Sequence, residues 1–264
     1  MKGRAILDNK KFFINNVEEI IPAVNDSPYE RILAVGDVHA AFDKLTSLWE
    51  KLSVDDNTFT IFLGDYLYGM SDQNVETLRW LIEHKKRKNI IFLRGNTDES
   101  FLKHLFDDQE KIFHGLNSRT AVDIKLAAVK EPYLPQEIFD FLNNLPLYHC
   151  MTIGGRKYFF CHAGINVAVP LEAQTKTYLI DHPKIKNFYQ NYSGNAVIIV
   201  GHKSPKKIFN KLPNLFAQPE KLDFTKPVVV PHKNIIMLDT KAKDDDGKIS
   251  CINILSGECW QSHK

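Results

Sequence analysis

The chain has 264 residues, which is enough for one large α/β domain or two small ones and for a sizeable hydrophobic core. Hydrophobic residues make up 44% of the sequence and charged residues 25%, a balance typical of globular proteins. The formal net charge is only +2, so the composition gives no electrostatic reason to expect a nucleic-acid or membrane partner.

Four cysteines are spread through the chain without C-x-x-C spacing, and in a chain of this length they form no disulfide framework. They are predicted to be reduced thiols of the core. The first residues, MKGRAILDNKKFF, are interrupted by charges and lack the apolar centre of a signal peptide. No apolar run is long enough to span a bilayer. A cytoplasmic protein is therefore expected.

The first half of the chain alternates predicted strands and helices. Residues 1–29 contain Pro22 and Pro28 and indicate an N-terminal extension or an edge hairpin. Short apolar runs predict strands at residues 31–35, 58–63 and 90–93. Apolar residues three or four positions apart predict helices between these strands, at 41–52 and after Asp72. This alternation predicts a largely parallel sheet with helices on both faces.

The second half has fewer clear signals. Residues 107–147 are predicted to be mainly helical, and two further buried strands are predicted at residues 158–161 and 196–200. Residues 235–238 and 249–255 are predicted to pair as a terminal hairpin. The run Asp-Asp-Asp-Gly between them, at 244–247, lacks the ligand spacing of an EF-hand and favours an Asp-Gly turn.

Every one of the five predicted buried strands is followed by a motif that combines glycine with polar residues. The motifs are Gly36-Asp37-Val38-His39, Gly64-Asp65, Gly95-Asn96, His162-Ala163-Gly164 and Gly201-His202. A single Gly-Asp pair is usually a helix N-cap, and a single buried histidine usually satisfies a hydrogen bond. Ligands of α/β sheets, however, bind outside the carboxyl ends of strands. As an ordered set, the motifs direct two Asp, one Asn and three His side chains to one crevice.

These six side chains offer mixed oxygen and imidazole ligands, which suit two borderline divalent cations such as Mn²⁺, Fe or Zn²⁺. One carboxylate would have to bridge the two ions. Two such centres about 3.5–4 Å apart can hold a hydroxide between them and clamp both oxygens of an in-line displacement at phosphorus. The set therefore predicts a dinuclear metal centre for phosphoester hydrolysis.

The motifs GDVH, GDYLYG, RGN, CHAG and GH follow the order and spacing of the calcineurin-like metallophosphoesterases, and the chain resembles that family from about residue 31 to 258. It is most similar to the branch of bacterial and phage Ser/Thr phosphatases and symmetrical diadenosine tetraphosphatases. Residues 168–175, 238–240 and 251–258 support that placement. The resemblance implies an α/β fold, a four-layer α/β/β/α sandwich of two mixed β-sheets flanked by helices, as a single domain over residues 1–264.

The resemblance also implies a role for each polar side chain and a cofactor. The implied ligands are Asp37 and His39 on the first metal, Asp65 as the bridge, and Asn96, His162 and His202 on the second metal. The implied cofactors are two divalent ions, with Mn²⁺ preferred over Fe and Zn²⁺. The expected partner is a phosphorylated substrate, either a small molecule or a phosphoprotein, and no nucleic acid or membrane is expected.

The chain departs from the family pattern where the leaving group and the phosphate are handled. Thr97 stands where the family has the histidine of G-N-H-[ED], which acts as the general acid. Tyr68 replaces the aspartate that orients this histidine, and Gly69 replaces a phosphate-binding arginine. A second family arginine has no match in residues 180–184. General acid catalysis typically contributes ~10²–10⁴ in rate, so its loss favours substrates with good leaving groups.

Other residues are candidates to replace the missing groups. The candidate acids are Asp98, Tyr68, His104 and His182, and the candidate phosphate contacts are Arg94, Lys184 and Lys203. Residues 107–147 and 166–195 are expected to shape the substrate cleft.

Three functions remain open from the sequence. The first is a Ser/Thr phosphatase-like metallophosphatase. The second is a dinucleoside polyphosphate or nucleotide hydrolase, whose leaving group needs less protonation. The third, of another class, is a metal-holding but weakly catalytic module that binds phosphorylated ligands. The intact ligand set argues against the third, because such ligands are costly to bury without metal.

Overall fold

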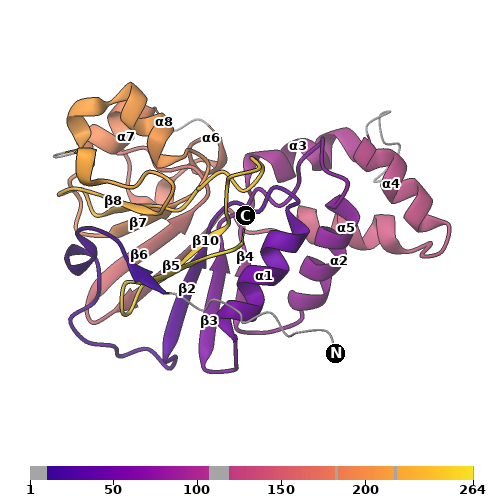
Figure 1. Ribbon diagram of the computed structural model, residues 1–264, viewed down its shortest axis with the longest axis horizontal. Helices are drawn as coiled ribbons and strands as arrows, with labels where there is room; N and C mark the ends of the chain where they lie inside the picture. Colours follow the sequence, from indigo (N-terminus) through magenta and orange to yellow (C-terminus); the bar gives the residue numbers. More distant parts are fainter. Residues whose placement is uncertain (1–10, 107–118, 182–183, 217–218, 264) are drawn as a thin grey trace, which may run out of the picture.

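The structure is a computed structural model, and it describes residues 11–106, 119–181, 184–216 and 219–263 (Figure 1). Two β-sheets pack against each other, and helices cover the outer face of each sheet. Each sheet contains both parallel and antiparallel strand pairs. The four-layer α/β/β/α sandwich of two mixed sheets is therefore confirmed.

The six-stranded sheet has the strand order β1-β11-β10-β2-β3-β4. Its strands are β1 (Phe12–Phe13), β2 (Arg31–Val35), β3 (Thr58–Phe62), β4 (Ile90–Phe92), β10 (Ser250–Asn253) and β11 (Glu258–Gln261). Strands β2, β3 and β4 are parallel because helices α1 (Phe42–Leu52) and α2 (Asn74–His84) return the chain to the same end of the sheet. The strands predicted in this half agree with the observed ones to within one residue. The predicted N-terminal extension supplies edge strand β1, which pairs with β11.

The five-stranded sheet has the order β5-β6-β7-β9-β8. Its strands are β5 (Tyr148–Ile153), β6 (Arg156–Cys161), β7 (Val197–Val200), β8 (Val228–Val230) and β9 (Ile235–Met237). Helices α6 (Lys176–Ile180), α7 (Ile185–Asn191) and α8 (Pro205–Lys211) lie on its outer face (Figure 1). The parallel pairs β6–β7 and β7–β9 place the carboxyl ends of three strands at one edge.

Side chains alternate between two apolar layers along each central strand. On β2, Leu33 packs toward the helices while Ile32 lies between the two sheets. On β6, Phe160 lies between the sheets, and Phe159 and Cys161 pack toward α6–α8. Neighbouring residues of a strand point to opposite faces, and both faces are covered. This double burial explains why the strands are continuous apolar runs in the sequence.

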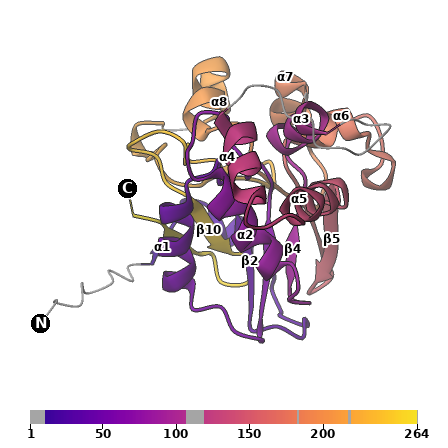
Figure 2. The same ribbon diagram turned by 90° about the vertical axis from the view of Figure 1, so that its right-hand side faces the viewer.

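The middle of the chain is helical, as predicted. Helices α3 (Asn96–Leu105), α4 (Arg119–Ala128) and α5 (Leu134–Asn143) pack with α1 and α2 on the outer side of the six-stranded sheet (Figure 2). Residues 107–118 of the predicted helical segment lie outside the described residues. Within the ranges that the structure describes, no helix combines the length and apolar character needed to cross a membrane.

The predicted terminal hairpin is wrong. Strand β9 lies in the five-stranded sheet between β7 and β8, whereas β10 lies in the six-stranded sheet between β2 and β11. The two strands are buried on both faces, so their pattern does not show which sheet each enters. The hairpin partner of β10 is β11, and their turn contains Gly257 at a φ of 76°. The segment from 238 to 249 therefore crosses from one sheet to the other.

Candidate metal centre

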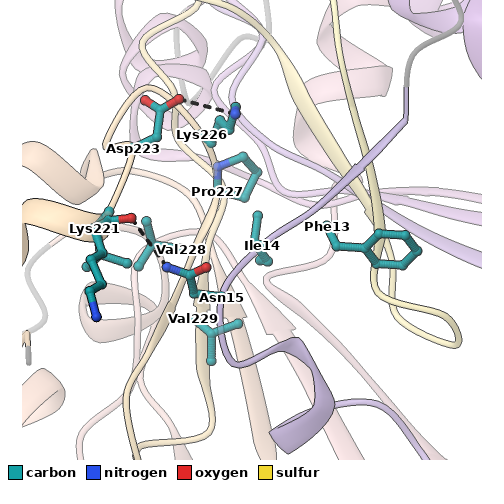
Figure 3. Close-up of a pocket in the computed structure, with 10 residues that line it drawn as sticks. Phe13, Ile14, Asn15, Lys221, Asp223, Lys226, Pro227, Val228 and Val229 are labelled. Atoms are coloured by element: carbon teal, nitrogen blue, oxygen red, sulfur yellow. Dashed lines mark hydrogen bonds and ion pairs between the residues drawn. The ribbon is translucent and has the colours of Figure 1, made fainter. Parts of the chain in front are cut away.

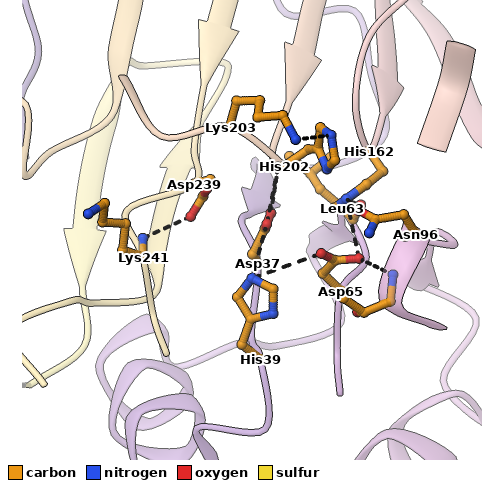
Figure 4. A network of polar contacts seen from close by, with 12 residues as sticks. Asp37, His39, Leu63, Asp65, Asn96, His162, His202, Lys203, Asp239 and Lys241 are labelled. Atoms are coloured by element: carbon orange, nitrogen blue, oxygen red, sulfur yellow. Dashed lines mark hydrogen bonds and ion pairs between the residues drawn. The ribbon is translucent and has the colours of Figure 1, made fainter. Parts of the chain in front are cut away.

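The six predicted ligands gather at the carboxyl ends of five strands, β2, β3, β4, β6 and β7 (Figure 4). Two groups of three have ligand atoms that all lie within 4.8 Å of one another. The groups are Asp37, His39 and Asp65, and Asp65, His162 and His202. Asp65 is the only member of both groups. This arrangement has the form of two neighbouring cation sites that share one carboxylate.

Four pairs of ligand atoms lie between 3.0 and 3.9 Å apart. His39 Nε2 lies 3.6 Å from Asp37 Oδ2 and 3.9 Å from Asp65 Oδ2. On the other side, His162 Nε2 lies 3.3 Å from Asp65 Oδ1 and 3.0 Å from Asn96 Oδ1. Asn96 therefore belongs with the second group, and each oxygen of Asp65 faces a different histidine.

The hydrogen bond of His162 Nδ1 leaves its other ring nitrogen, Nε2, available to bind a metal ion. His162 is fully buried, and its Nδ1 lies 3.0 Å from the carbonyl oxygen of Leu63. Because a carbonyl can only accept, Nδ1 carries the hydrogen, and in the neutral ring Nε2 keeps its lone pair toward Asp65 and Asn96. Metal-binding histidines are commonly oriented in this way.

The backbone is held in unusual conformations at the ligands. His39, Asp65 and His202 have φ values of 49°, 54° and 62°, in the left-handed region. Such conformations cost about 1–3 kcal/mol each for residues other than glycine, and they cluster at functional sites. Glycines are needed where the ligands approach the backbone. A Cβ atom at Gly95 would lie 2.2 Å from Asp65 Oδ1, and one at Gly201 would lie 2.0 Å from Asp37 Oδ1.

Asp98 contributes to this backbone geometry. Its side chain is fully buried, and its carboxylate accepts hydrogen bonds from the backbone N–H groups of Asp65 and Tyr66 at 2.9 Å and of Gly95 at 2.8 Å. Burial, and then the nearby Asp65 carboxylate, raise the pKa of Asp98 to about 7. Asp98 thus ties the loop after β3 to the start of α3, and it does not line the cavity described below.

The pKa values of the ligands are strongly perturbed because the groups are buried together. Burial, and then the Asp239 carboxylate, raise the pKa of Asp37 well above its ordinary value. Burial would also raise the pKa of Asp65, but His162 holds it well below its ordinary value. Burial lowers the pKa of His162, but Asp65 outweighs this effect and raises the value to about 9. Burial instead lowers the pKa of His39, and it lowers that of His202 to about 2. The cluster therefore favours one proton, on His162, beside its carboxylates. A donor set of carboxylates, imidazoles and an amide oxygen fits two divalent cations, whose binding would displace that proton.

The metal cluster borders a cavity of about 560 Å³. His39, Asp65, Asn96 and His202 form one part of its wall together with Thr97. The remaining lining residues come from α8 and the crossing segment, and they are Lys203, Ser204, Lys206, Lys207, Asn210, Lys211, Asp239, Lys241, Lys243 and Asp244. Thr97, where the family has its acid, is therefore at the mouth of the metal site, and its backbone N–H donates to Asp65 Oδ1 at 2.9 Å.

The other candidate acids lie elsewhere. The ring of Tyr68 is edge-on to that of His39, with 6.1 Å between centroids, and Tyr68 is not part of the cavity wall. His104 is exposed near the end of α3, and its Nδ1 lies 2.6 Å from the Ser100 carbonyl oxygen. His182 lies outside the described residues.

Among the candidate phosphate contacts, the structure brings only Lys203 to the cavity. Arg94 is buried, with its guanidinium 2.8 Å from Glu99 Oε2 and 2.6 Å from the Asn143 carbonyl oxygen, so it is already paired. Lys184 is exposed just before α7.

Asp239 and most of the lysines of the cavity are site residues that were not predicted from the sequence. Asp239 is 7% exposed and follows β9, so it obeys the same rule as the ligands, a polar residue directly after a buried strand. The spacing of Lys203, Lys206 and Lys207 directly after the Gly-His motif was also available in the sequence. Their approach to Lys241 and Lys243 depends on the crossing segment, whose path was predicted incorrectly.

A second cavity, of about 150 Å³, lies between the residues that follow β1 and those that precede β8 (Figure 3). Two contacts join polar groups of its wall. Asn15 Nδ2 donates to the Lys221 carbonyl oxygen at 3.5 Å, and Asp223 lies 3.3 Å from Lys226. Its lining residues include neither histidine nor cysteine, and its chemistry does not resemble that of the metal cluster.

Cys161 precedes His162 but faces away from it. The thiol is fully buried in the core beneath α6–α8, its Sγ lies 3.5 Å from the Gly164 carbonyl oxygen, and burial raises its pKa. A protonated core thiol is a poor nucleophile. Cys161→Ser should therefore keep kcat/KM within about threefold while lowering thermal stability, because a hydroxyl is costlier to bury.

Thiol labelling checks this expectation. Cys150 is exposed because it lies on edge strand β5, so the prediction of a core thiol is wrong for this residue. A thiol reagent should label Cys150 and leave activity intact, and Cys150→Ser provides the matched control. Loss of turnover that parallels labelling of Cys161 would contradict a metal-based reaction.

Fold and site together define a metallophosphoesterase. The chain belongs to the calcineurin-like phosphoesterase family, whose model matches residues 30–230, and it is a metal-dependent phosphoester hydrolase. The asymmetrical bis(5'-nucleosyl)-tetraphosphatase PrpE of Bacillus subtilis (strain 168) is 21% identical over 199 residues, which cover 66% of this chain and 80% of that protein.

Two solved structures share the fold. A candidate diadenosine tetraphosphatase superposes with a TM-score of 0.57 at 17% identity, covering 92% of this chain and 98% of the other. A protein serine/threonine phosphatase from Saccharomyces cerevisiae superposes with a TM-score of 0.52 at 15% identity, covering 90% and 78%. At these identities the two structures establish the fold alone.

Proposed function

We propose that this chain hydrolyses phosphoanhydrides and activated phosphate esters at two divalent ions held by the six clustered side chains. The proposal is supported above all by the position of Asp65, which belongs to both ligand groups. The neighbouring cavity wall contains Thr97 at the position where the family has an acid. When bound, a pair of divalent ions supplies Lewis acidity and lowers the pKa of water.

The roles of the chain's own residues follow from their positions. Asp37 and His39 would hold one ion, and Asn96, His162 and His202 the other, with Asp65 shared. Asp98 would act as a positioning residue, through its three bonds to backbone N–H groups. Lys203 would contact the phosphate in place of the missing arginines, because its Nζ lies 2.5 Å from His202 Nε2 at the cavity wall.

The wall composition favours one substrate class over another. A phosphoserine leaving group is an alkoxide that needs a proton, and a threonine hydroxyl is too weak an acid to provide it. A nucleotide leaving group needs much less protonation. We therefore place phosphoanhydride substrates, of the kind named for the PrpE relative, ahead of phosphoproteins. Manganese as the metal and a cytoplasmic location stay predictions.

Turnover of an activated aryl phosphate tests the proposal. Purified protein supplied with manganese should hydrolyse p-nitrophenyl phosphate, and a chelator should abolish the reaction reversibly. A metal-loaded protein that binds phosphate but shows no turnover with either this substrate or a dinucleoside tetraphosphate would instead support the weakly catalytic binding module.

Metal content gives a separate prediction. After gentle manganese loading and removal of free metal, elemental analysis should find about two ions per chain, because the six ligands divide into two groups. Loading in the presence of Mg²⁺ and Ca²⁺ is the control for loose surface binding, which these ions would displace. A content that stays near zero would contradict both the metal site and the reaction.

A further inference from the structure

Six lysines line the cavity beside the metal cluster, and they come from two separate segments. Lys203, Lys206, Lys207 and Lys211 belong to α8 and the loop before it, and Lys241 and Lys243 belong to the segment that crosses between the sheets. In the view of Figure 4, Lys241 and Asp239 lie on the side of Asp37 away from Asn96. The basic wall is therefore adjacent to the metal ligands but extends beyond them.

The crossing segment is held in place by a partly buried lysine. The ammonium group of Lys44, on α1, donates to the carbonyl oxygens of Ala242 at 3.0 Å, Asp244 at 2.8 Å and Gly247 at 2.7 Å. Three carbonyl acceptors on one ammonium fix the path of this segment. The position of Lys243 is further defined by the ring of Tyr68, whose centroid lies 5.6 Å from Nζ.

Three of the six lysines have contacts within the protein that explain their positions. Lys241 lies 3.3 Å from Asp244, and Lys206 lies over the rings of Phe209 and Phe224 at 5.3 and 5.4 Å. Lys203 contacts His202.

The other three cationic side chains have no carboxylate partner among the residues that the structure describes. They are Lys207, Lys211 and Lys243, and all three are exposed toward the cavity. Lys207 and Lys211 are four residues apart on α8, where like charges share a face and repel each other. An anion bound in the cavity beside these side chains would relieve this repulsion.

We propose that Lys207, Lys211 and Lys243 form a second anion subsite, which binds the additional phosphates of a substrate that contains a phosphate chain. The proposal rests on the function proposed above and names its substrate class: a chain of at least two or three phosphates, free or esterified, with one phosphorus at the metals. Lysine is a suitable point charge for phosphate oxygens. A cavity of about 560 Å³ lies within the range of small-ligand sites and leaves room beyond a single phosphate.

Calorimetric titration tests the subsite separately from turnover. The full chain, loaded with manganese and kept in excess manganese, is titrated with methylphosphonate and with the methylene-bridged analogue of tripolyphosphate, which cannot be hydrolysed. The parent should bind the analogue more tightly. Lys207→Gln/Lys211→Gln should weaken analogue binding about tenfold and methylphosphonate binding less than about twofold. Lys243→Gln, on the crossing segment, should weaken the analogue selectively as well.

A matched control changes the charge by the same amount elsewhere. Lys88→Gln/Lys130→Gln replaces two exposed lysines that do not line the cavity, and it should leave both affinities unchanged. If this control variant lost as much analogue affinity as the cavity variants, the effect would come from the net charge of the protein, and the proposed subsite would be wrong. A phosphopeptide with acidic flanks that bound more tightly than the analogue, with the same lysine dependence, would assign these lysines to a protein partner and also overturn it.

The two proposals fail in different ways. If p-nitrophenyl phosphate is hydrolysed and methylphosphonate binds, but the lysine variants do not change analogue affinity, only the second subsite is wrong. If neither ligand binds the metal-loaded parent and no aryl phosphate is turned over, the proposed function is wrong as well.

Discussion

Asp65→Asn is expected to remove more metal than any other single substitution in the ligand set and to lower kcat/KM by at least about 10²-fold. Asp65 belongs to both ligand groups, with one oxygen 3.3 Å from His162 Nε2 and the other 3.9 Å from His39 Nε2. An amide has one oxygen acceptor and no charge, so it cannot serve two cations. Mutation of a residue that only hydrogen-bonds to a metal ligand typically lowers metal affinity or activity 10–100-fold. Mutation of a ligand shared by two ions should lower both by more.

Variants of ligands that belong to only one group should lose less metal than Asp65→Asn. Asp37→Asn and Asn96→Ala each affect one group, so elemental analysis should find about one ion per chain in these variants and close to none in Asp65→Asn. Asp223→Asn makes the same chemical change in the distant cavity of Figure 3 and should keep the parent metal content. Two retained ions in Asp65→Asn would show that this carboxylate is not the bridge.

The second large effect concerns Thr97 and Tyr68. Without an acid, kcat/KM should fall steeply as the pKa of the leaving group rises, so that aryl phosphates with acidic phenols react well and phosphoserine reacts poorly. Thr97 lines the cavity, so a histidine at this position would reach the leaving group. The Tyr68 side chain now packs edge-on to His39 and offers no carboxylate to orient an imidazole.

Thr97→His together with Tyr68→Asp should therefore raise kcat/KM for alkyl phosphates by about tenfold or more, exceeding the product of the two single effects. The gain with p-nitrophenyl phosphate should stay within about twofold, because this leaving group needs little protonation. The measurement is a plot of log kcat/KM against leaving-group pKa for the parent, the two single variants and the double variant.

Thr97→His with Tyr68→Phe is the matched control. It keeps an aromatic ring against His39 and restores the imidazole without a carboxylate, so its slope should resemble that of Thr97→His alone. A shallow slope in the parent would mean that another group already protonates the leaving group. Asp98 is fully buried and paired with backbone N–H groups, so Lys203 would then be tested first.

The ligand cluster was predictable because it depends on short-range signals. Strands β2, β3, β4, β6 and β7 are continuous apolar runs, and each is followed by glycine and a polar side chain. Parallel strands end at the same edge of a sheet, so the strand ends group Asp37, Asp65 and Asn96 in one sheet and His162 and His202 in the other. The packing of the two sheets then brings together residues more than 160 positions apart. Asp37 and His202 are one such pair, with the His202 N–H donating to both Asp37 oxygens at 3.1 Å.

The pairing of the last strands was not predictable in this way. Strands β9 and β10 are buried on both faces, and local pattern does not distinguish a hairpin from a crossing between sheets. Only packing in three dimensions decides that β10 inserts between β2 and β11. The lysines of the crossing segment consequently reach the cavity from a direction that the sequence did not indicate.

The sequence by itself determined the strand ends, the six converging ligands and the absence of the family's acid and arginines, because each is a matter of residue type at a local position. Tertiary structure alone decided which charged groups are available to a substrate. Arg94 is close to Asn96 in sequence, but its guanidinium is paired with Glu99. Asp98 is adjacent to Thr97 in sequence, but its carboxylate accepts hydrogen bonds from backbone N–H groups. Lys211 and Lys243 are distant in sequence and line one cavity. The partners of a charge depend on distances across the fold, and residue spacing along the chain does not contain those distances.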